Sequence, residues 1–204
     1  MIVFFGKTSG GGISAQSTGP LQGVRGYWEA LRRDGGIPRR ADVEPRGMAS
    51  CLEHVFLLER IAPGLARFRL AGMHLTDLMG MDVRGMPLSA LFDPLARSRL
   101  AQEVEQVFAG PAILEIGLEA ERGIGRKPLA GRMILLPLRG DGREPALALG
   151  CLVTEGAIGA APRRFAVTNT LIEALCTPAP QTSRVDAPPQ PPAHPWLRLI
   201  SSRE

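Results

Sequence analysis

The stretch ARFRLAGMHLTDLMGMDVRGMPLSALF, residues 66–92, decides how the rest of the chain is interpreted. It opens as a strand, because Phe68 and Leu70 alternate with arginines in the period of two typical of half-buried β-strands. A glycine ends this strand, and one helical turn is predicted from three apolar residues at helical spacing: Leu75, Leu78 and Met79. A strand followed by short helices and then by more strands predicts an α+β domain, with short helices over one face of a sheet.

The residues of this stretch resemble the PAS sensor domain. The pattern that carries the resemblance consists of Arg69, Leu70, Ala71, Gly72, Leu78, Gly80, Asp82, Gly85, Leu88, Leu91 and Phe92. A helix containing Tyr27 and Trp28 and the segment PRRADVEP, residues 38–45, precede the first strand. These two features are similar to those of a bacterial subfamily of short, stand-alone PAS proteins. The resemblance covers about residues 21–156 and implies a sensory or regulatory module.

The expected fold is therefore α+β, with a PAS-like five-stranded antiparallel sheet, short helices over one face and an N-terminal flanking helix. Apolar patterning predicts its strands at residues 55–60, 65–71, 112–121, 129–139 and 146–154. The last of these is almost continuously apolar, as in a central strand that is covered on both faces. In the PAS order it pairs beside the first strand. The longest predicted helix begins after Asp93-Pro94 and ends near Gly110.

Composition divides the chain into four parts. Residues 1–20 are predicted to be disordered, except that residues 2–5 could add a strand, and residues 21–156 form the PAS-like domain. Residues 157–176 are predicted to contain a C-terminal helix, at about 165–175. Residues 177–204 form a proline-rich tail that is predicted to be disordered. The tail contains the apolar cluster Trp196, Leu197, Leu199 and Ile200, either a partner-binding motif or a segment that docks on its own domain.

Charge and cysteine content favour a cytoplasmic protein. The chain of 204 residues carries a net charge of +4, almost all of its basic residues are arginine, and these are scattered. A solvated surface explains this pattern better than a nucleic-acid interface does. The three cysteines are far apart, as in a reduced protein, and no stretch has the length of a membrane span.

The sequence does not predict an enzyme. His54, His74 and His194 have no metal-ligand spacing, and no nucleophile elbow is present. Carboxylate pairs such as Glu103 and Glu105 are interpreted as solvated charge. The expected function is a non-enzymatic regulatory module that binds a small apolar ligand, a signalling protein partner, or both. The alternative is a small-molecule carrier or enzyme that uses the sheet cavity and could contain haem or flavin.

The resemblance implies a ligand pocket between the sheet and the connecting helices. The residues predicted to line it are Phe56, Leu58, Phe68, Leu70, Leu78, Met79, Leu135 and Cys151. No cofactor is identified. His74 is the candidate haem ligand because it stands at the start of the connecting helices, where haem-binding PAS domains carry an axial histidine; a structural role is the alternative.

The N-terminal helix carries an apolar stripe with two interpretations. Four residues at helical spacing form it: Val24, Tyr27, Trp28 and Leu31. The stripe is either the contact of a homodimer or a face that packs on the sheet of its own domain, and the sequence does not decide between them.

Overall fold

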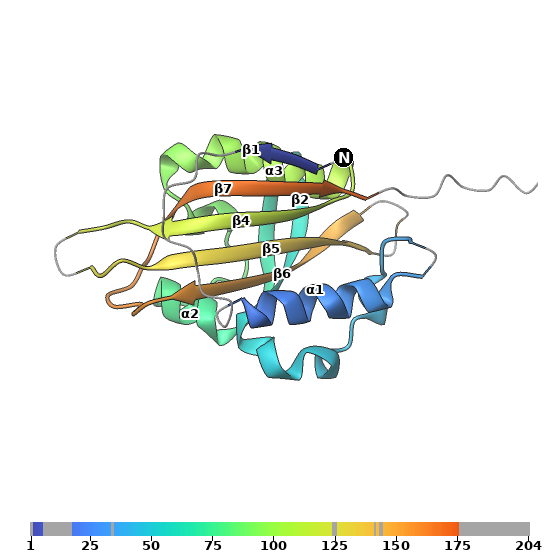
Figure 1. The fold of residues 1–204 in the computed structure, drawn as a ribbon, viewed down its shortest axis with the longest axis horizontal. Coiled ribbons are helices and arrows are strands. Elements are labelled where there is room, and N and C mark those ends of the chain that lie inside the picture. Colours follow the sequence, from blue (N-terminus) through green and yellow to red (C-terminus); the bar gives the residue numbers. More distant parts are fainter. Residues whose placement is uncertain are drawn as a thin grey trace, which may run out of the picture.

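Strands β2 (Val55–Ala62) and β3 (Leu65–Ala71) form the antiparallel hairpin that the sequence predicts. They belong to a computed structural model that describes residues 2–5, 18–33, 35–123, 126–140, 142 and 145–175. The other strands are β1 (Ile2–Phe5), β4 (Ala112–Ala120), β5 (Ala130–Arg139), β6 (Pro145–Glu155) and β7 (Phe165–Ala174). All pair in one antiparallel sheet of order β1-β7-β4-β5-β6-β2-β3 (Figure 1).

The sheet confirms the expected α+β class and has two strands more than expected. The five predicted strands are adjacent to one another, and β6 pairs with β2, as the PAS order requires. Strand β1 confirms that residues 2–5 add a strand. The helix predicted at about 165–175 is wrong, because these residues form β7, which pairs with β4 along its whole length. β4 would otherwise leave its backbone hydrogen-bonding groups without strand partners on one side.

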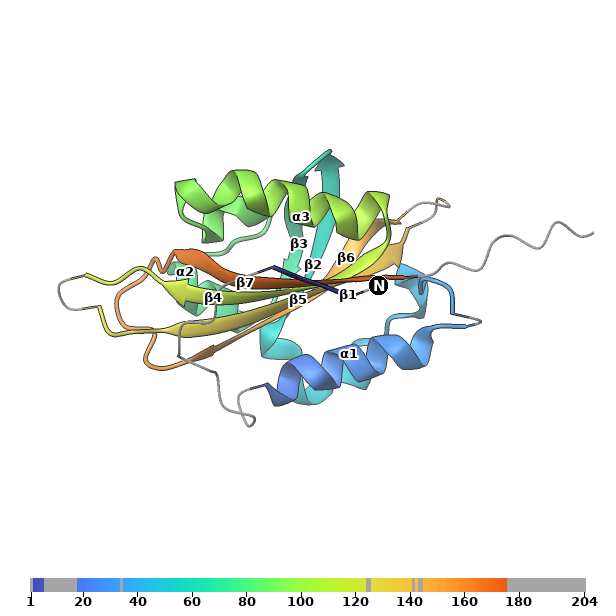
Figure 2. The same cartoon turned by 45° about the horizontal axis from the view of Figure 1, so that its top comes forward.

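Helices cover both faces of the sheet rather than one. The helical elements are α1 (Gly19–Leu31), η1 (Arg40–Asp42), η2 (Pro45–His54), α2 (Met73–Met79), η3 (Leu88–Leu91), η4 (Pro94–Ala96) and α3 (Arg97–Ala109). Figure 2 shows α3 on one side of the sheet and α1 on the other. One buried cluster packs α2, η3 and α3 on the sheet, and a second packs α1 and η2 on its opposite face.

The apolar stripe of α1 packs on the protein's own sheet. Val24 and Trp28 are completely buried in the second cluster, and the indole Nε1 of Trp28 donates a hydrogen bond of 2.9 Å to the backbone oxygen of Pro137. Tyr27 and Leu31 are partly buried against the same cluster. The residues of the predicted dimer contact therefore belong to the core of this chain. Homodimerisation stays a prediction, and it would have to use another surface.

Candidate functional site

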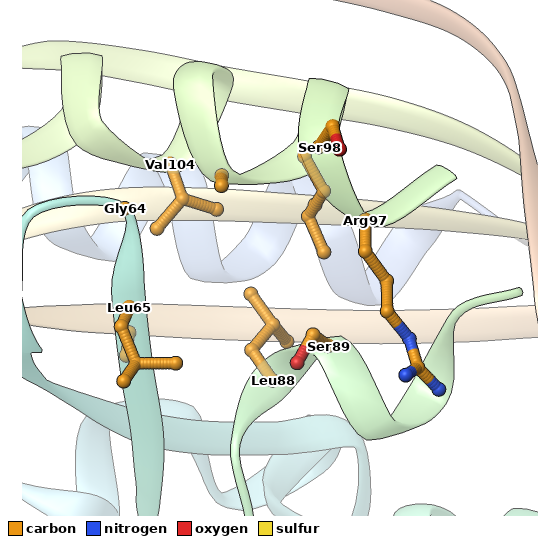
Figure 3. A pocket seen from close by; sticks show the side chains of 10 residues that line it. Gly64, Leu65, Leu88, Ser89, Arg97, Ser98 and Val104 are labelled. Carbon is orange, nitrogen blue, oxygen red and sulfur yellow. The ribbon is translucent and has the colours of Figure 1, made fainter. Parts of the chain in front are cut away.

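The strongest candidate for a binding site is a groove between β3, η3 and α3, which we call the α3 groove (Figure 3). It has a volume of about 320 Å³. Its lining consists of Gly64, Leu65, Ala66, Leu88, Ser89, Arg97, Ser98, Leu100, Ala101 and Val104. The volume is at the lower end of the range of about 300–1,000 Å³ that small-molecule sites occupy.

The polar groups of the α3 groove lie toward one end. In Figure 3, Arg97 extends from α3 toward η3, where Ser89 lies beside Leu88, while Leu65 and Val104 lie toward the other end. The Nε of Arg97 donates a long hydrogen bond of 3.4 Å to the backbone oxygen of Phe92. An apolar groove with a few polar groups suits a mainly apolar molecule that carries a polar group.

The β2–β3 turn is held against α3 by Glu105. The Oε2 of Glu105 accepts a hydrogen bond of 2.7 Å from the backbone N–H of Gly64, and its other oxygen pairs with Arg60. Gly64 has φ +70°, and a Cβ at this position would approach the backbone oxygen of Ala101 to 3.1 Å. Glycine fits both the left-handed conformation and the close approach, so this contact sets one wall of the groove.

A second link joins α3 to β7. The hydroxyl of Thr170 donates a hydrogen bond of 3.0 Å to Oε1 of Glu103, and the Nε of Arg99 donates one of 2.7 Å to the same oxygen. Arg99 Nη2 also donates to Oγ1 of Thr170 at 2.8 Å. Glu103 and Thr170 are both buried, so the interpretation of Glu103 as solvated charge is wrong. Its spacing from Leu100 and Val107 already places Glu103 on the buried stripe.

In a comparison with protein-family models, the model described as PAS domain matches residues 17–153. The chain belongs to the PAS domain family. The match includes α3 and ends before β7, so Thr170 lies outside the matched part of the chain and its partner Glu103 lies inside it. Comparisons with curated proteins and with solved structures gave no match. The resemblance to stand-alone bacterial PAS proteins stays a prediction.

The predicted pocket residues do not line the α3 groove of this PAS domain. Six of them are buried in the cluster beneath α2, η3 and α3: Phe56, Leu58, Phe68, Leu78, Met79 and Leu135. The rings of Phe56 and Phe68 meet edge to face, with centroids 5.4 Å apart. These side chains fill the space in which a pocket was expected and serve as core, and Phe56 also borders a second groove on the opposite face.

The remaining two predicted pocket residues, Leu70 and Cys151, lie elsewhere. Cys151 is buried in the cluster on the α1 face, and burial raises the pKa of its thiol to about 12. Burial also raises the pKa of Cys51, in the same cluster. Both cysteines therefore remain as thiols at neutral pH and act as small core residues.

Leu70 borders a second groove, which we call the β3 groove. It has a volume of about 200 Å³ and is bordered by the β2–β3 hairpin, the segment from η1 to η2, and β6. Its lining is Arg40, Val43, Pro45, Met48, Leu52, Val55, Phe56, Leu57, Leu70, Ala71, Gly72 and Leu149. Leu70 keeps 51% of its surface exposed and Leu52 keeps 41%, so the groove presents apolar side chains to solvent.

His74, the candidate haem ligand, contacts protein groups and lines neither groove. Its Nε2 lies 3.1 Å from Oγ1 of Thr154, and its ring centroid lies 4.7 Å from that of His54. Burial, with His54 as the second cause, lowers the pKa of His74. Among the described residues, no cluster of His, Cys, Asp and Glu has the composition of a metal site. These contacts support the structural alternative.

The lowered pKa of His74 makes stability depend on pH. As the pH falls through about 6.5, the ordinary pKa of histidine, His74 takes up its proton more readily in the unfolded chain than in the folded one, so its contribution to the free energy of unfolding should fall. His54 and Thr154 contact the ring, Glu53 and Asp77 interact with it through their charge, and all four are unchanged in a His74→Gln variant. We expect this variant to lose less stability than wild type between about pH 7.5 and pH 5.5 in urea unfolding. If the free energy of unfolding changed equally with pH in both proteins, the prediction would be contradicted.

Arg163, which the sequence analysis did not single out, is completely buried. Its guanidinium donates hydrogen bonds to the backbone oxygens of Ile158 and Lys127, and its backbone N–H donates one of 2.8 Å to the oxygen of Leu78 at α2. Two residues later, the backbone oxygen of Phe165 accepts a hydrogen bond of 3.0 Å from the N–H of Asp93. The start of β7 is thus attached both to α2 and to the chain between η3 and η4.

Within the described parts of the chain, no helix combines the length and the apolar composition that crossing a bilayer requires.

Proposed function

We propose that this PAS domain is a non-enzymatic sensory or regulatory module that binds a small, mainly apolar molecule in the α3 groove. Occupancy of the groove changes the position of α3, and β7 transmits this change to a protein partner. A cytoplasmic location fits this role. The observation that carries the proposal is that a single helix, α3, both lines the groove and holds β7 through Glu103 and Thr170.

The lining of the groove supports a ligand of this kind. Leu65, Leu88, Leu100 and Val104 supply apolar contacts along it, and Arg97 supplies hydrogen-bond donors. A ligand shape with an apolar body and one polar end matches this distribution, because each buried polar group then has a partner.

The link to β7 supports a regulatory output rather than storage. Because Glu103 and Thr170 are buried, the hydrogen bond between them has no bulk water to replace it when α3 moves. A displacement of α3 therefore changes either the position of β7 or the strength of this contact. β7 is followed directly by the remainder of the chain, so the change reaches a segment outside the PAS-matched residues.

Binding is tested with anilinonaphthalene sulfonate, an apolar fluorescent molecule with one anionic group. We expect Ser89→Phe, which places a ring in the α3 groove, to weaken its binding about tenfold. Leu70→Glu in the β3 groove is the matched control and should leave this affinity unchanged. If only Leu70→Glu lowers the affinity, or if neither variant lowers it, the α3 groove is not the site.

Coupling between the α3 groove and β7 is measured by hydrogen exchange of the β7 amides with and without anilinonaphthalene sulfonate. Binding should change β7 exchange in wild type and not in Thr170→Val, which keeps the branched shape of the side chain but has no hydroxyl to donate to Glu103 or to accept from Arg99. An equal response in both proteins would refute transmission through this contact.

An absorbance spectrum of the purified protein tests the alternative function. A haem or flavin band would favour a carrier or an enzyme over a regulatory module.

A further inference from the structure

The β3 groove is the uncovered corner of the α1 face. Elsewhere on this face, α1 and η2 bury the apolar side chains of β5 and β6. At the hairpin, Leu52 and Leu70 remain 41% and 51% exposed beside the buried residues Met48 and Leu57. Apolar surface left open next to a core cluster is a typical position for a docking segment.

The described chain ends on the same face of the sheet. Leu175, which follows β7, packs against the buried cluster beneath α1, and its N–H donates a hydrogen bond of 2.9 Å to the backbone oxygen of Pro111. One row of paired residues crosses the sheet from β7 to the groove: Ile172, Leu114, Leu135, Gly150, Phe56 and Ala71. Five strand spacings of about 4.8 Å make this distance about 24 Å.

The sequence beyond Leu175 has a suitable length and chemistry. Residues 176–195 contain many prolines and few apolar residues, and the apolar cluster Trp196, Leu197, Leu199 and Ile200 follows them. A flexible chain as long as 176–195 has a root-mean-square span of about 25 Å, and a fully extended polyproline chain spans about 60 Å. The average linker span therefore matches the straight distance across the sheet, and the extended linker leaves additional length for a path around α1.

We propose that residues 196–200 bind in the β3 groove of the same chain. The match between linker and distance gives an effective concentration in the millimolar range, far above the concentration of a second copy in a dilute solution. Trp196 and the leucines cover the exposed surfaces of Leu52 and Leu70. The PAS domain then carries its own ligand for this face, and an external protein gains access by displacing it. This proposal does not depend on a ligand in the α3 groove.

The test uses the full chain labelled with 5-fluorotryptophan, because the sequence contains two tryptophans, Trp28 and Trp196. A Trp196→Phe variant assigns the two ¹⁹F resonances, and Trp28 in the core reports on the fold. We expect the wild-type Trp196 resonance to differ from that of a free peptide of residues 190–204. Leu70→Glu should lower the docked population about tenfold and move the resonance to the peptide's position.

Leu95→Glu is the matched control, because Leu95 is 97% exposed in η4 and borders neither groove. It should leave the Trp196 resonance in place, as should a hundredfold dilution. If Leu70→Glu also moves the Trp28 resonance, Leu52→Glu serves as the second groove variant. A wild-type Trp196 resonance at the free-peptide position, or one that neither groove variant shifts, overturns the proposal. A resonance that changes on dilution assigns the groove to a second copy and overturns it as well.

Discussion

We expect Trp28→Ala to lower the free energy of unfolding by about 3–5 kcal/mol, because the side chain is completely buried between α1 and the sheet. The substitution removes the largest fully buried side chain of the described residues. It also leaves the backbone oxygen of Pro137 without its donor. Urea unfolding followed by circular dichroism measures the change.

Trp28→Phe is the matched control, since it keeps much of the apolar volume and removes the indole N–H together with one of the two fused rings. Its loss should be clearly smaller than that of Trp28→Ala. If Trp28→Ala kept the wild-type stability and sedimented as a smaller species, the stripe of α1 would be a dimer contact after all. The buried position of Val24 beside it argues for the core.

The second large effect is expected at Arg163, where alanine should lower the free energy of unfolding by about 3 kcal/mol. The guanidinium is completely buried, and its two hydrogen bonds are made to the backbone oxygens of Ile158 and Lys127. Removing it leaves both oxygens without these donors, at a point where β7 joins the rest of the domain. Thermal unfolding of the two proteins gives the comparison.

Two control variants test whether the loss comes from the buried guanidinium. Arg163→Lys keeps the positive charge but has a single ammonium in place of the guanidinium fork, so it should recover only part of the loss. Arg164→Ala removes an exposed arginine one residue later and should change stability by less than about 0.5 kcal/mol. Equal losses in Arg163→Ala and Arg164→Ala would contradict the role given to the buried guanidinium.

Local patterns predicted the central strands and α3 because their burial repeats with a regular period. The β2–β3 hairpin has a turn at Pro63-Gly64, and apolar residues of α3 at helical spacing, including Leu100 and Val104, are buried. The segment 165–175 fits a helical period as well as an alternating one. Pairing with the open edge of β4 favours the strand over the helix. A long-range contact of this kind cannot be recognised from the spacing of apolar residues within one segment.

The candidate site was predicted less well than the fold. The resemblance placed the pocket between the sheet and the connecting helices, and on six of the eight expected residues the helices pack without leaving space. The α3 groove is instead bounded by Gly64 and Arg97, whose positions depend on how closely a turn approaches a helix. Glu103 could have been identified, because it shares the spacing of buried residues. Arg163 could not, because its burial is produced by loops from distant parts of the chain.

The position of β1 affects how the protein emerges from the ribosome. β1 precedes every other described strand in the sequence, yet it pairs with β7, the last of them. At about 5–20 residues per second, synthesis separates the two strands by roughly 10–30 s. Once β4 has been made, it lacks its neighbour β7 until that strand follows, so the nascent sheet has an open edge that can pair with other chains. A ribosome that stalls before β7 would therefore leave an aggregation-prone product, although most of the PAS core has already been made.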